Sequence, residues 1–237
     1  MESTLTTNIL DSAHTLIAGA TGCGKSVLIH HVICEALQQP TARGELYLID
    51  LKRGVELCEY EKLPHVARFA IDVPQALDAL DNAITIMTRR LDAMRAHGDK
   101  LYPGRDLWIV IDELAFLLQS ARKQALPKLT LISQQGRAAK VHLICCSQNP
   151  GRSQKSGIPA EIQQNFTLKV ALHCSTAIES RQVIGVNGAE ALPKHGTALV
   201  WSEGFVTREE VPMITEQEKA DAIRSSRSQQ ILHVRAI

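Results

Sequence analysis

The chain has 237 residues and a mass of 26.0 kDa, which is enough for one well-buried α/β domain. Hydrophobic residues make up 45% and charged residues 22%, and this composition excludes a disordered or fibrous chain. The net charge of +1 excludes a surface that traps phosphates everywhere, so any nucleic-acid contact must depend on a few local loops.

Neither a membrane anchor nor an export signal is visible. No apolar run approaches the ~18 residues that a membrane-spanning helix needs, and the first residues lack a basic region followed by an apolar core. The six cysteines have no CxxC spacing and mostly lie inside apolar runs, which favours reduced buried thiols over a structural zinc site. We therefore expect a cytoplasmic protein with no transmembrane segment of its own.

The first predicted strand, His14–Ala18, leads into a glycine-rich loop and then a predicted helix, Lys25–Gln38. The loop, GATGCGKS, matches the phosphate-loop pattern G-x-x-x-x-G-K-[ST] in the strand–loop–helix context that its mechanism requires. In such a loop, backbone N–H groups surround the phosphates, the lysine reaches the β- and γ-oxygens, and the hydroxyl binds Mg²⁺. The predicted nucleotide-binding residues are Gly19, Ala20, Thr21, Gly22, Cys23, Gly24, Lys25, Ser26 and Val27, with Lys25 catalytic and Ser26 a metal ligand.

The next predicted elements are a buried strand, Glu45–Asp50, and a long amphipathic helix, Pro74–His97. Asp50 and Lys52 follow the strand, and two interpretations of them remain open. They belong to the nucleotide site, or they form an ion pair at the exit of a strand.

A third buried strand, Leu107–Ile111, runs directly into Asp112 and Glu113. A phosphate loop needs a second acid for the metal and a base for the attacking water, so we assign Asp112 to Mg²⁺ and Glu113 to the water. The alternative is an acidic helix cap, which explains one acid better than two adjacent ones. A further helix is predicted at Leu126–Ala139.

The fourth strand, Val141–Ser147, ends at Gln148, which we expect beside the strand that bears Asp112. An amide there can sense the γ-phosphate, although a polar residue capping a strand is the alternative. A strand at Phe166–Leu172, a helix near Thr176–Ile184 and a last strand at Thr197–Trp201 follow.

Continuous apolar strands separated by helices predict an α/β fold with a mostly parallel central sheet and helices on both faces. The residues beyond Pro212 are polar with a helical pattern. We therefore expect a motor domain at 1–212 and a peripheral helical tail at 213–237.

Several ordered segments give the chain a family resemblance. They are HTLIAGATGCGKS, LIDLKRGVELCEYEKLPHV, LWIVIDELAFLL, QQGRAAKVHLICCSQNP, IPAEIQQNFTLKV, ESRQVIG and GAEALPKHGTALV. Together they resemble the FtsK/SpoIIIE family of DNA translocases over nearly the whole chain. The resemblance implies a RecA-like P-loop NTPase that uses ATP and Mg²⁺, assembles as a hexameric ring of identical subunits, and holds double-stranded DNA in its channel.

The resemblance also implies site residues. Arg137, in QQGRAAKVH, matches the arginine that reaches the ATP of a neighbouring subunit, and a surface arginine at a helix end is the alternative. Many family members carry an arginine after the sensor glutamine, where this chain has Asn149. The candidate DNA-binding residues are Arg152, Lys155 and Arg181, the last of which matches the ESR-like triplet.

The family's membrane segments and its winged-helix reader are missing from the sequence. We therefore expect a bare motor, an excised piece, or a member that works with a separate membrane or DNA-processing partner. The leading function is an ATP-driven translocase of duplex DNA in segregation, conjugative transfer or packaging. The alternatives are a type VII secretion-like motor that moves proteins and a catalytically idle nucleotide-binding module, against which the intact Lys25, Asp112 and Glu113 argue.

Overall fold

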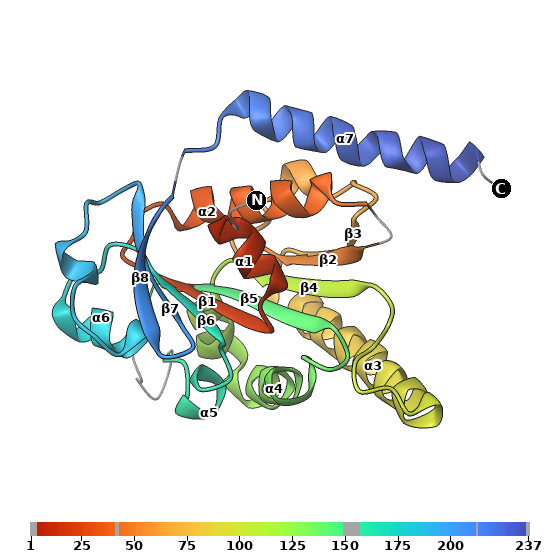
Figure 1. The fold of residues 1–237 in the computed structure, drawn as a ribbon, viewed down its shortest axis with the longest axis horizontal. Coiled ribbons are helices and arrows are strands. Elements are labelled where there is room, and N and C mark those ends of the chain that lie inside the picture. The colour runs from red at the N-terminus through yellow and green to blue at the C-terminus, as the bar shows by residue number, and fades with distance from the viewer. Residues whose placement is uncertain (1–3, 41–42, 149–156, 212, 236–237) are drawn as a thin grey trace.

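The computed structural model describes residues 4–40, 43–148, 157–211 and 213–235, and its centre is an eight-stranded sheet (Figure 1). The strand order is β3-β2-β4-β5-β1-β6-β7-β8. The strands are β1 (His14–Ala18), β2 (Gly44–Ile49), β3 (Val66–Ala70), β4 (Asp106–Ile111), β5 (Val141–Ser147), β6 (Leu168–Ala171), β7 (Thr197–Ser202) and β8 (Phe205–Glu210).

Neighbouring strands from β3 to β6 pair in parallel, and only β7 and β8 are antiparallel. The carboxyl ends of six strands therefore lie along one edge of the sheet, which we call the carboxyl edge, and their starts lie along the amino edge. Because β5 lies between β1 and β4, the residues that follow these three strands are neighbours at the carboxyl edge.

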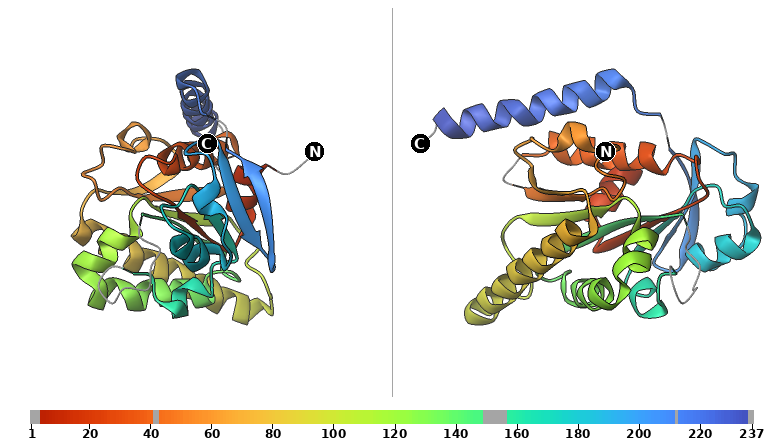
Figure 2. Two further views of the ribbon diagram at one scale, coloured as in Figure 1. Left: turned by 90° about the vertical axis from the view of Figure 1, so that its left-hand side faces the viewer. Right: turned by 180° about the vertical axis from the view of Figure 1, so that it is seen from behind.

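Helices cover both faces of the sheet, as predicted. In Figures 1 and 2, α1, α2 and the outer α7 lie over one face, and α3, α4 and α5 lie over the other. The helices are α1 (Leu5–Asp11), α2 (Lys25–Gln38), α3 (Val73–His97), α4 (Leu114–Gln135), α5 (Ala160–Gln163), α6 (Ala177–Ile184) and α7 (Glu216–Arg235), with short 3-10 turns η1 (Cys58–Tyr60) and η2 (Ala189–Ala191).

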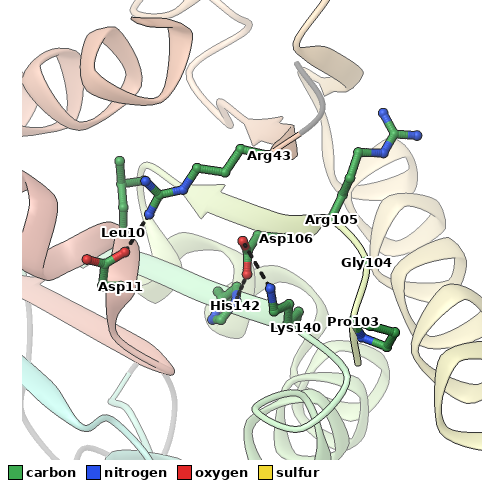
Figure 3. Close-up of a pocket in the computed structure, with 9 residues that line it drawn as sticks. All are labelled: Leu10, Asp11, Arg43, Pro103, Gly104, Arg105, Asp106, Lys140 and His142. Carbon is green, nitrogen blue, oxygen red and sulfur yellow. Dashed lines mark hydrogen bonds and ion pairs between the residues drawn. The ribbon is translucent and has the colours of Figure 1, made fainter. Parts of the chain in front are cut away.

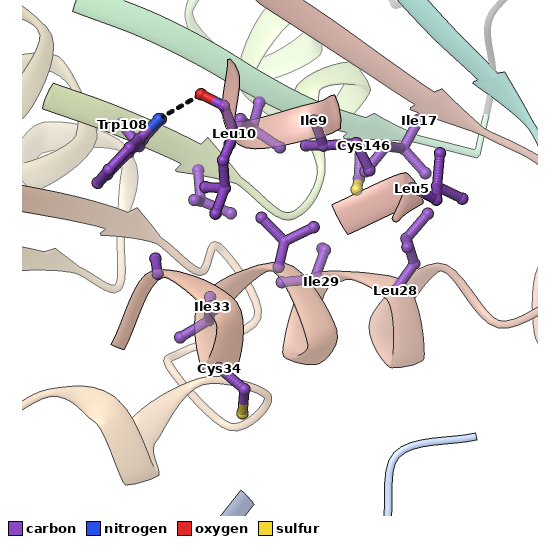
Figure 4. Close-up of a cluster of buried hydrophobic side chains, with 14 of the residues drawn as sticks. Leu5, Ile9, Leu10, Ile17, Leu28, Ile29, Ile33, Cys34, Trp108 and Cys146 are labelled. Atoms are coloured by element: carbon purple, nitrogen blue, oxygen red, sulfur yellow. Dashed lines mark hydrogen bonds between the residues drawn. The ribbon is translucent and has the colours of Figure 1, made fainter. Parts of the chain in front are cut away.

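Two large apolar clusters hold these layers together, one on each face of the sheet. Figure 4 shows part of the first, where Ile9 of α1 and Ile29 of α2 pack against Ile17 and Cys146 of the sheet. The buried Trp108 donates its indole N–H to the Leu10 carbonyl at 2.9 Å, so the ring fills the cluster and its one polar atom is satisfied.

The structure corrects several predicted elements. The helix predicted at Leu126–Ala139 is α4, which begins at Leu114 and ends at Gln135, with Pro127 inside it and a non-helical Ala121 between two merged segments. The strand at Thr197–Ser202 is not the last, since β8 follows it, and β8, β3 and α1 were not predicted.

The segment after residue 213 is the helix α7, which packs against α2 (Figure 1). His65 connects α7 to the end of α2, because its Nδ1 lies 2.8 Å from Ser226 Oγ and its Nε2 lies 3.0 Å from the Gln39 carbonyl. The predicted boundary at Pro212 falls on a residue outside the described ranges, so the division into two parts stays a prediction. Among the described helices, none has the length and apolar character to span a bilayer.

Candidate nucleotide-binding site

The phosphate loop follows β1 and turns sharply into α2. Gly24 occupies the N-cap of α2 with φ 99°, and Gly22 has φ 70°, backbone conformations that residues with a side chain rarely adopt. Gly19 faces another constraint, because an added Cβ would lie 2.7 Å from Cys23 Sγ and 2.9 Å from Leu172 Cβ. The loop is also tied to the end of β6, since the N–H of Ala20 donates to the His173 carbonyl at 2.8 Å.

The lysine of the loop is folded against the loop itself. Lys25 is buried, and its ammonium donates to the carbonyls of Gly19 at 2.8 Å and Ala20 at 2.7 Å. These two acceptors keep a buried cation satisfied. Cys23 is also buried, and burial raises the pKa of its thiol, so this side chain packs behind the loop as a neutral group.

The two acids follow β4 at the same edge. Asp112 is almost fully buried, and Glu113 stands directly before the first residue of α4. Glu113 occupies the N-cap position of α4 but makes no side-chain capping hydrogen bond; its Oε1 instead accepts from the backbone N–H of Gln148 at 3.3 Å. The side chain is therefore directed to the end of β5 rather than to the first turn of α4.

Gln148 joins the two halves of the site. It follows β5, and its Oε1 accepts from the Thr21 hydroxyl of the phosphate loop at 2.7 Å while its backbone N–H contacts Glu113. One residue thus contacts both the phosphate loop and the acid pair. The expected position of Gln148 beside the Asp112 strand is observed, because β4 and β5 are paired.

Asp50 and Lys52 have different roles. Asp50 is fully buried, and its carboxylate accepts from the backbone N–H groups of Lys52, Glu56 and Leu57 at 2.8 to 3.0 Å, which shapes the turn after β2. This turn presents Lys52, whose Nζ lies 2.9 Å from Asp112 Oδ2. Only Lys52 lines the cavity at the site.

Burial controls the ionisation of both acids. It raises the pKa of Asp112 above its ordinary value, and the nearby Lys52 ammonium opposes that shift. Burial also raises the pKa of Glu113, with the hydrogen bond from Gln148 opposing the shift and the negative Asp112 adding to it. A carboxylate with a raised pKa is a stronger base, which suits proton removal from water.

These residues surround one cavity of about 450 Å³. Of the predicted loop residues, those that line it are Thr21, Gly22, Gly24, Lys25, Ser26 and Val27, whereas Gly19, Ala20 and Cys23 do not. Lys52, Asp112, Glu113 and Gln148 complete its polar side. The residue pattern missed two lining residues, His195 before β7 and Met213 after β8, because they come from segments far along the chain with no motif of their own.

Arg137 lies at the other edge of the sheet. It is in the turn between α4 and β5, and β5 is seven residues long, which at ~3.3 Å per residue separates Arg137 from Gln148 by roughly 20 Å. Arg137 therefore cannot reach the cavity of its own chain. Arg181 lies on α6 and donates to Asn187 Oδ1 at 2.6 Å without lining the cavity. Arg152 and Lys155 lie outside the described residues.

The amino edge has a larger cavity of about 510 Å³, drawn in Figure 3. Its charges neutralise one another, since Arg43 pairs with Asp11, and the Asp106 carboxylate lies 3.0 Å from His142 Nε2 and 3.9 Å from Lys140 Nζ. It also lacks a phosphate loop. The candidate nucleotide site is therefore the smaller cavity at the carboxyl edge.

The cavity's donor set suits a magnesium ion. Mg²⁺ in nucleotide sites takes one or two protein oxygens and completes its shell with phosphates and water, so it needs no dense protein cage. Ser26 and Asp112 offer a hydroxyl and a carboxylate in one cavity. Asp112 Oδ2 is buried, and the group that lies against it is the Lys52 ammonium. A carboxylate oxygen that already faces one positive group is suited to a metal cation.

A parallel sheet with the phosphate-loop strand next to β5, and with a lysine, an acid pair and a glutamine around one cavity, defines the chain as a P-loop ATPase. The model of the FtsK/SpoIIIE family matches residues 1–104, which include the phosphate loop and end before Asp112. The similarity to individual relatives extends further. The DNA translocase FtsK of Staphylococcus epidermidis is 31% identical over 89% of this chain, and that of Listeria monocytogenes is 29% identical over 94%. The chain belongs to the FtsK/SpoIIIE family.

The chain spans only 29% and 32% of the length of these two relatives. Two solved structures extend the comparison. The cytoplasmic domain of the type VII secretion ATPase EccC from Thermomonospora curvata has a TM-score of 0.71 and 25% identity over 90% of this chain and 27% of its own. The pCW3 conjugation coupling protein TcpA, solved with ATPgS, has a TM-score of 0.78 and 23% identity over 91% of this chain and 65% of its own, which supports the fold.

Proposed function

We propose that this chain is the motor of a double-stranded DNA translocase, which hydrolyses Mg-ATP between subunits of a cytoplasmic homo-oligomeric ring, hexameric as in the family resemblance. The ATPase part rests on one observation, the convergence of Lys25, Asp112, Glu113 and Gln148 around one cavity. The DNA part rests on the 31% identity to a DNA translocase over 89% of the chain.

The chain's own residues would divide the work. The loop N–H groups and the start of α2 bind the phosphates, and Lys25 exchanges its two carbonyl acceptors for phosphate oxygens. Ser26 and Asp112 would hold Mg²⁺, which neutralises the developing charge on the phosphate oxygens. Glu113 takes a proton from the attacking water, and Gln148 orients that water or reports the loss of the γ-phosphate through its contacts with Thr21 and Glu113.

Arg137 would act on the ATP of a neighbouring subunit. It is exposed, at the edge opposite its own cavity, and no ion pair or hydrogen bond engages its side chain among the described residues. A second copy that places this edge against the first copy's cavity would bring a fixed positive charge to the transferring phosphoryl group. The ring is thereby required for full activity.

The direct test is ATP hydrolysis with and without linear duplex DNA at several stated salt concentrations. We expect DNA to stimulate phosphate release, with the stimulation weakening as salt rises. Absence of stimulation at low salt, with hydrolysis present, would exclude the DNA part and leave the ATPase part standing.

The trans role is tested by mixing two inactive proteins. Arg137→Ala subunits keep an intact cavity, and Lys25→Ala subunits keep an intact arginine, so mixed rings contain some complete sites. We expect each variant alone to be about 10³-fold or more slower than wild type and the mixture to recover hydrolysis. Arg95→Ala, an exposed arginine on α3, is the matched control and should remain active. Mixtures without recovery would contradict the trans role.

A second candidate moves proteins rather than DNA. It is favoured by the 25% identity to the type VII secretion ATPase EccC over 90% of this chain. Such a motor would respond to a peptide substrate and remain indifferent to duplex DNA. The same hydrolysis assay, run with a secretion-signal peptide in place of DNA, separates the two candidates.

A further inference from the structure

The turn that carries Arg137, residues 136–140, is held by a side chain from a distant helix. Arg90 of α3 donates through its Nη1 to the carbonyls of Ala139 and Lys140, both at 2.9 Å. Two bonds from one guanidinium group to consecutive carbonyls fix the turn relative to α3. Charge-assisted bonds of this kind are about twice as strong as those between neutral groups.

A second element supports the same contact. The guanidinium carbon of Arg90 lies 4.6 Å from the centre of the Tyr102 ring, and the backbone N–H of Tyr102 donates to the Ala138 carbonyl at 2.9 Å. The ring thus limits the positions that Arg90 can occupy, while the backbone beside it holds the turn. The turn is therefore hydrogen-bonded both to helix α3, through Arg90, and to the loop between α3 and β4, through Tyr102.

The turn has little room to move on its inner side. An added Cβ at Gly136 would lie 2.6 Å from the Ile132 carbonyl oxygen and closer still to that of Val141, and His14 Cε1 would be 3.2 Å away. The turn closes through the N–H of Lys140 to the Arg137 carbonyl at 3.2 Å, with Lys140 at φ 54°. A non-glycine residue at positive φ is held there by its surroundings.

The side chain of Arg137 contrasts with this fixed backbone. Arg43 and Arg105 at the same edge are paired with Asp11 and Glu45 (Figure 3 shows the first pair), whereas the exposed Arg137 has no such partner within the described ranges. We propose that Arg90 is a positioning residue for Arg137, holding its turn so that the guanidinium meets the triphosphate bound by a second copy of this chain. This inference rests on the proposed function.

The physical need for such a clamp follows from the geometry of phosphoryl transfer. Misplacing a catalytic group by ~1 Å costs up to about 10²-fold in rate. Arg137 comes from a turn, and turns are ordinarily the more mobile parts of a protein. The clamp removes that mobility at the backbone and leaves the side chain available to the neighbouring subunit.

The test compares Arg90→Gln with Arg89→Gln, an exposed neighbour on α3, in the full chain. We expect Arg90→Gln to lower DNA-stimulated kcat by about 10- to 100-fold, with the affinity of the cavity for a fluorescent ATP analogue unchanged. Arg89→Gln should match wild type in both. Arg90→Lys should recover part of the rate, because an ammonium group can donate to the same carbonyls.

Two further measurements distinguish positioning from a general loss of stability. The double variant Arg90→Gln with Arg137→Ala should be no slower than Arg137→Ala alone, because Arg90 acts only through Arg137. Mixed rings of Arg90→Gln and Lys25→Ala subunits should recover hydrolysis. An extra loss in the double variant, or no recovery on mixing, overturns the proposal.

The remaining outcomes separate this inference from the proposed function. If Arg137→Ala slows hydrolysis and Arg90→Gln does not, only the positioning role falls. If Arg137→Ala leaves DNA-stimulated hydrolysis unchanged, the trans role and the clamp fall together. If Arg90→Gln does not fold, Tyr102→Leu decides, since it removes the stacked ring and keeps the backbone bond to Ala138; an unchanged kcat in that variant overturns the proposal.

Discussion

The two edges of the sheet both gather charged side chains, but they use them differently. At the carboxyl edge, Lys25, Lys52 and Gln148 contact other residues that line the cavity or the loop, and the proposed chemistry requires Lys25 to release its two carbonyls. At the amino edge, Asp106, His142 and their neighbours are joined in fixed pairs between strands. The same sheet therefore has one edge where side chains can exchange their hydrogen-bond partners and one edge where ion pairs hold the strands together.

The difference originates in the segments that follow or precede the strands. A glycine loop, an acid pair and a glutamine follow β1, β4 and β5, and glycines at positive φ let backbone donors face the cavity. The turn before β5 is different, with a buried glycine, Gly136, and a lysine, Lys140, whose backbone carbonyl accepts from Arg90. Arg137 has no partner among the described residues of the amino edge, and the proposed function explains this arrangement.

The largest expected effect tests the carboxyl edge. Glu113→Gln keeps the shape of the side chain and removes the base, so we expect hydrolysis to fall by about 10²- to 10⁴-fold with nucleotide binding retained. Phosphate release and binding of a fluorescent ATP analogue measure the two properties. Glu61→Gln, at an exposed position, is the control. A variant with wild-type hydrolysis would remove Glu113 from the mechanism.

The next effect concerns the stability of the amino edge. His14 lies beneath the Arg137 turn, and burial, with a smaller contribution from the neighbouring His142, lowers the pKa of His14 from 6.5 to about 3. Between these values the unfolded chain binds one more proton than the folded chain, so the free energy of unfolding falls as the pH falls. At about 1.4 kcal/mol per unit, lowering the pH from 6.5 to 5 should cost about 2 kcal/mol.

Urea unfolding at several pH values measures this contribution. His14→Asn retains an acceptor for the N–H of Leu143, which bonds to His14 Nδ1 at 3.1 Å, and it cannot titrate. In the variant, the free energy of unfolding should depend less on pH between 6.5 and 5, by an amount that corresponds to the uptake of about one proton on unfolding. Identical pH dependence in the two proteins would show that His14 is protonated while folded.

A smaller effect compares one ion pair from each edge. Lys52→Met leaves the buried Asp112 without its cation, and Asp106→Asn weakens the contacts with His142 and Lys140. Because Lys52 is 45% exposed, solvent screens its pair with Asp112, and we expect Lys52→Met to cost only about 1 kcal/mol of unfolding free energy. Asp106→Asn keeps an oxygen that can accept, and we expect a cost of about 1 kcal/mol there too. Mg²⁺ with an ATP analogue stabilises any protein that binds it, so each variant is compared with wild type at the same ligand concentration by thermal unfolding. We expect the difference from wild type to shrink for Lys52→Met and to persist for Asp106→Asn. An equal change in both differences would erase the contrast between the edges.

Much of this arrangement is predictable from residue patterns. The bounds of β1, α2 and β5 are those expected, because each combines a clear apolar pattern with a glycine or polar residue at its end. Residues directly after parallel strands must share an edge, so the loop, the acid pair and Gln148 could be brought together in advance. The exposed edge strands β3 and β8 could not, because partly or fully exposed side chains leave no apolar run.

Other features depend on contacts between distant segments. His195 and Met213 reach the cavity through the paths of the chain on either side of β7 and β8, which no local pattern encodes. The clamp from Arg90 joins residues about fifty positions apart through backbone carbonyls, and any residue type supplies a carbonyl. A pattern of side chains therefore cannot indicate such a bond.

The smallest expected effect is on the salt dependence of DNA binding, and it tests which edge of the sheet faces DNA. Arg181 follows β6 at the carboxyl edge, where its guanidinium is exposed and bonded to Asn187. If it contacts a phosphate, Arg181→Ala should reduce the slope of log affinity against log salt by about 0.9, while hydrolysis at saturating DNA stays near wild type. Lys100→Ala, an exposed cation near Arg137, is the matched control and should leave the slope unchanged. A reduced slope for Lys100→Ala alone would place the duplex along the amino edge, and Arg137 would then compete with DNA for the surface that must face the neighbouring subunit.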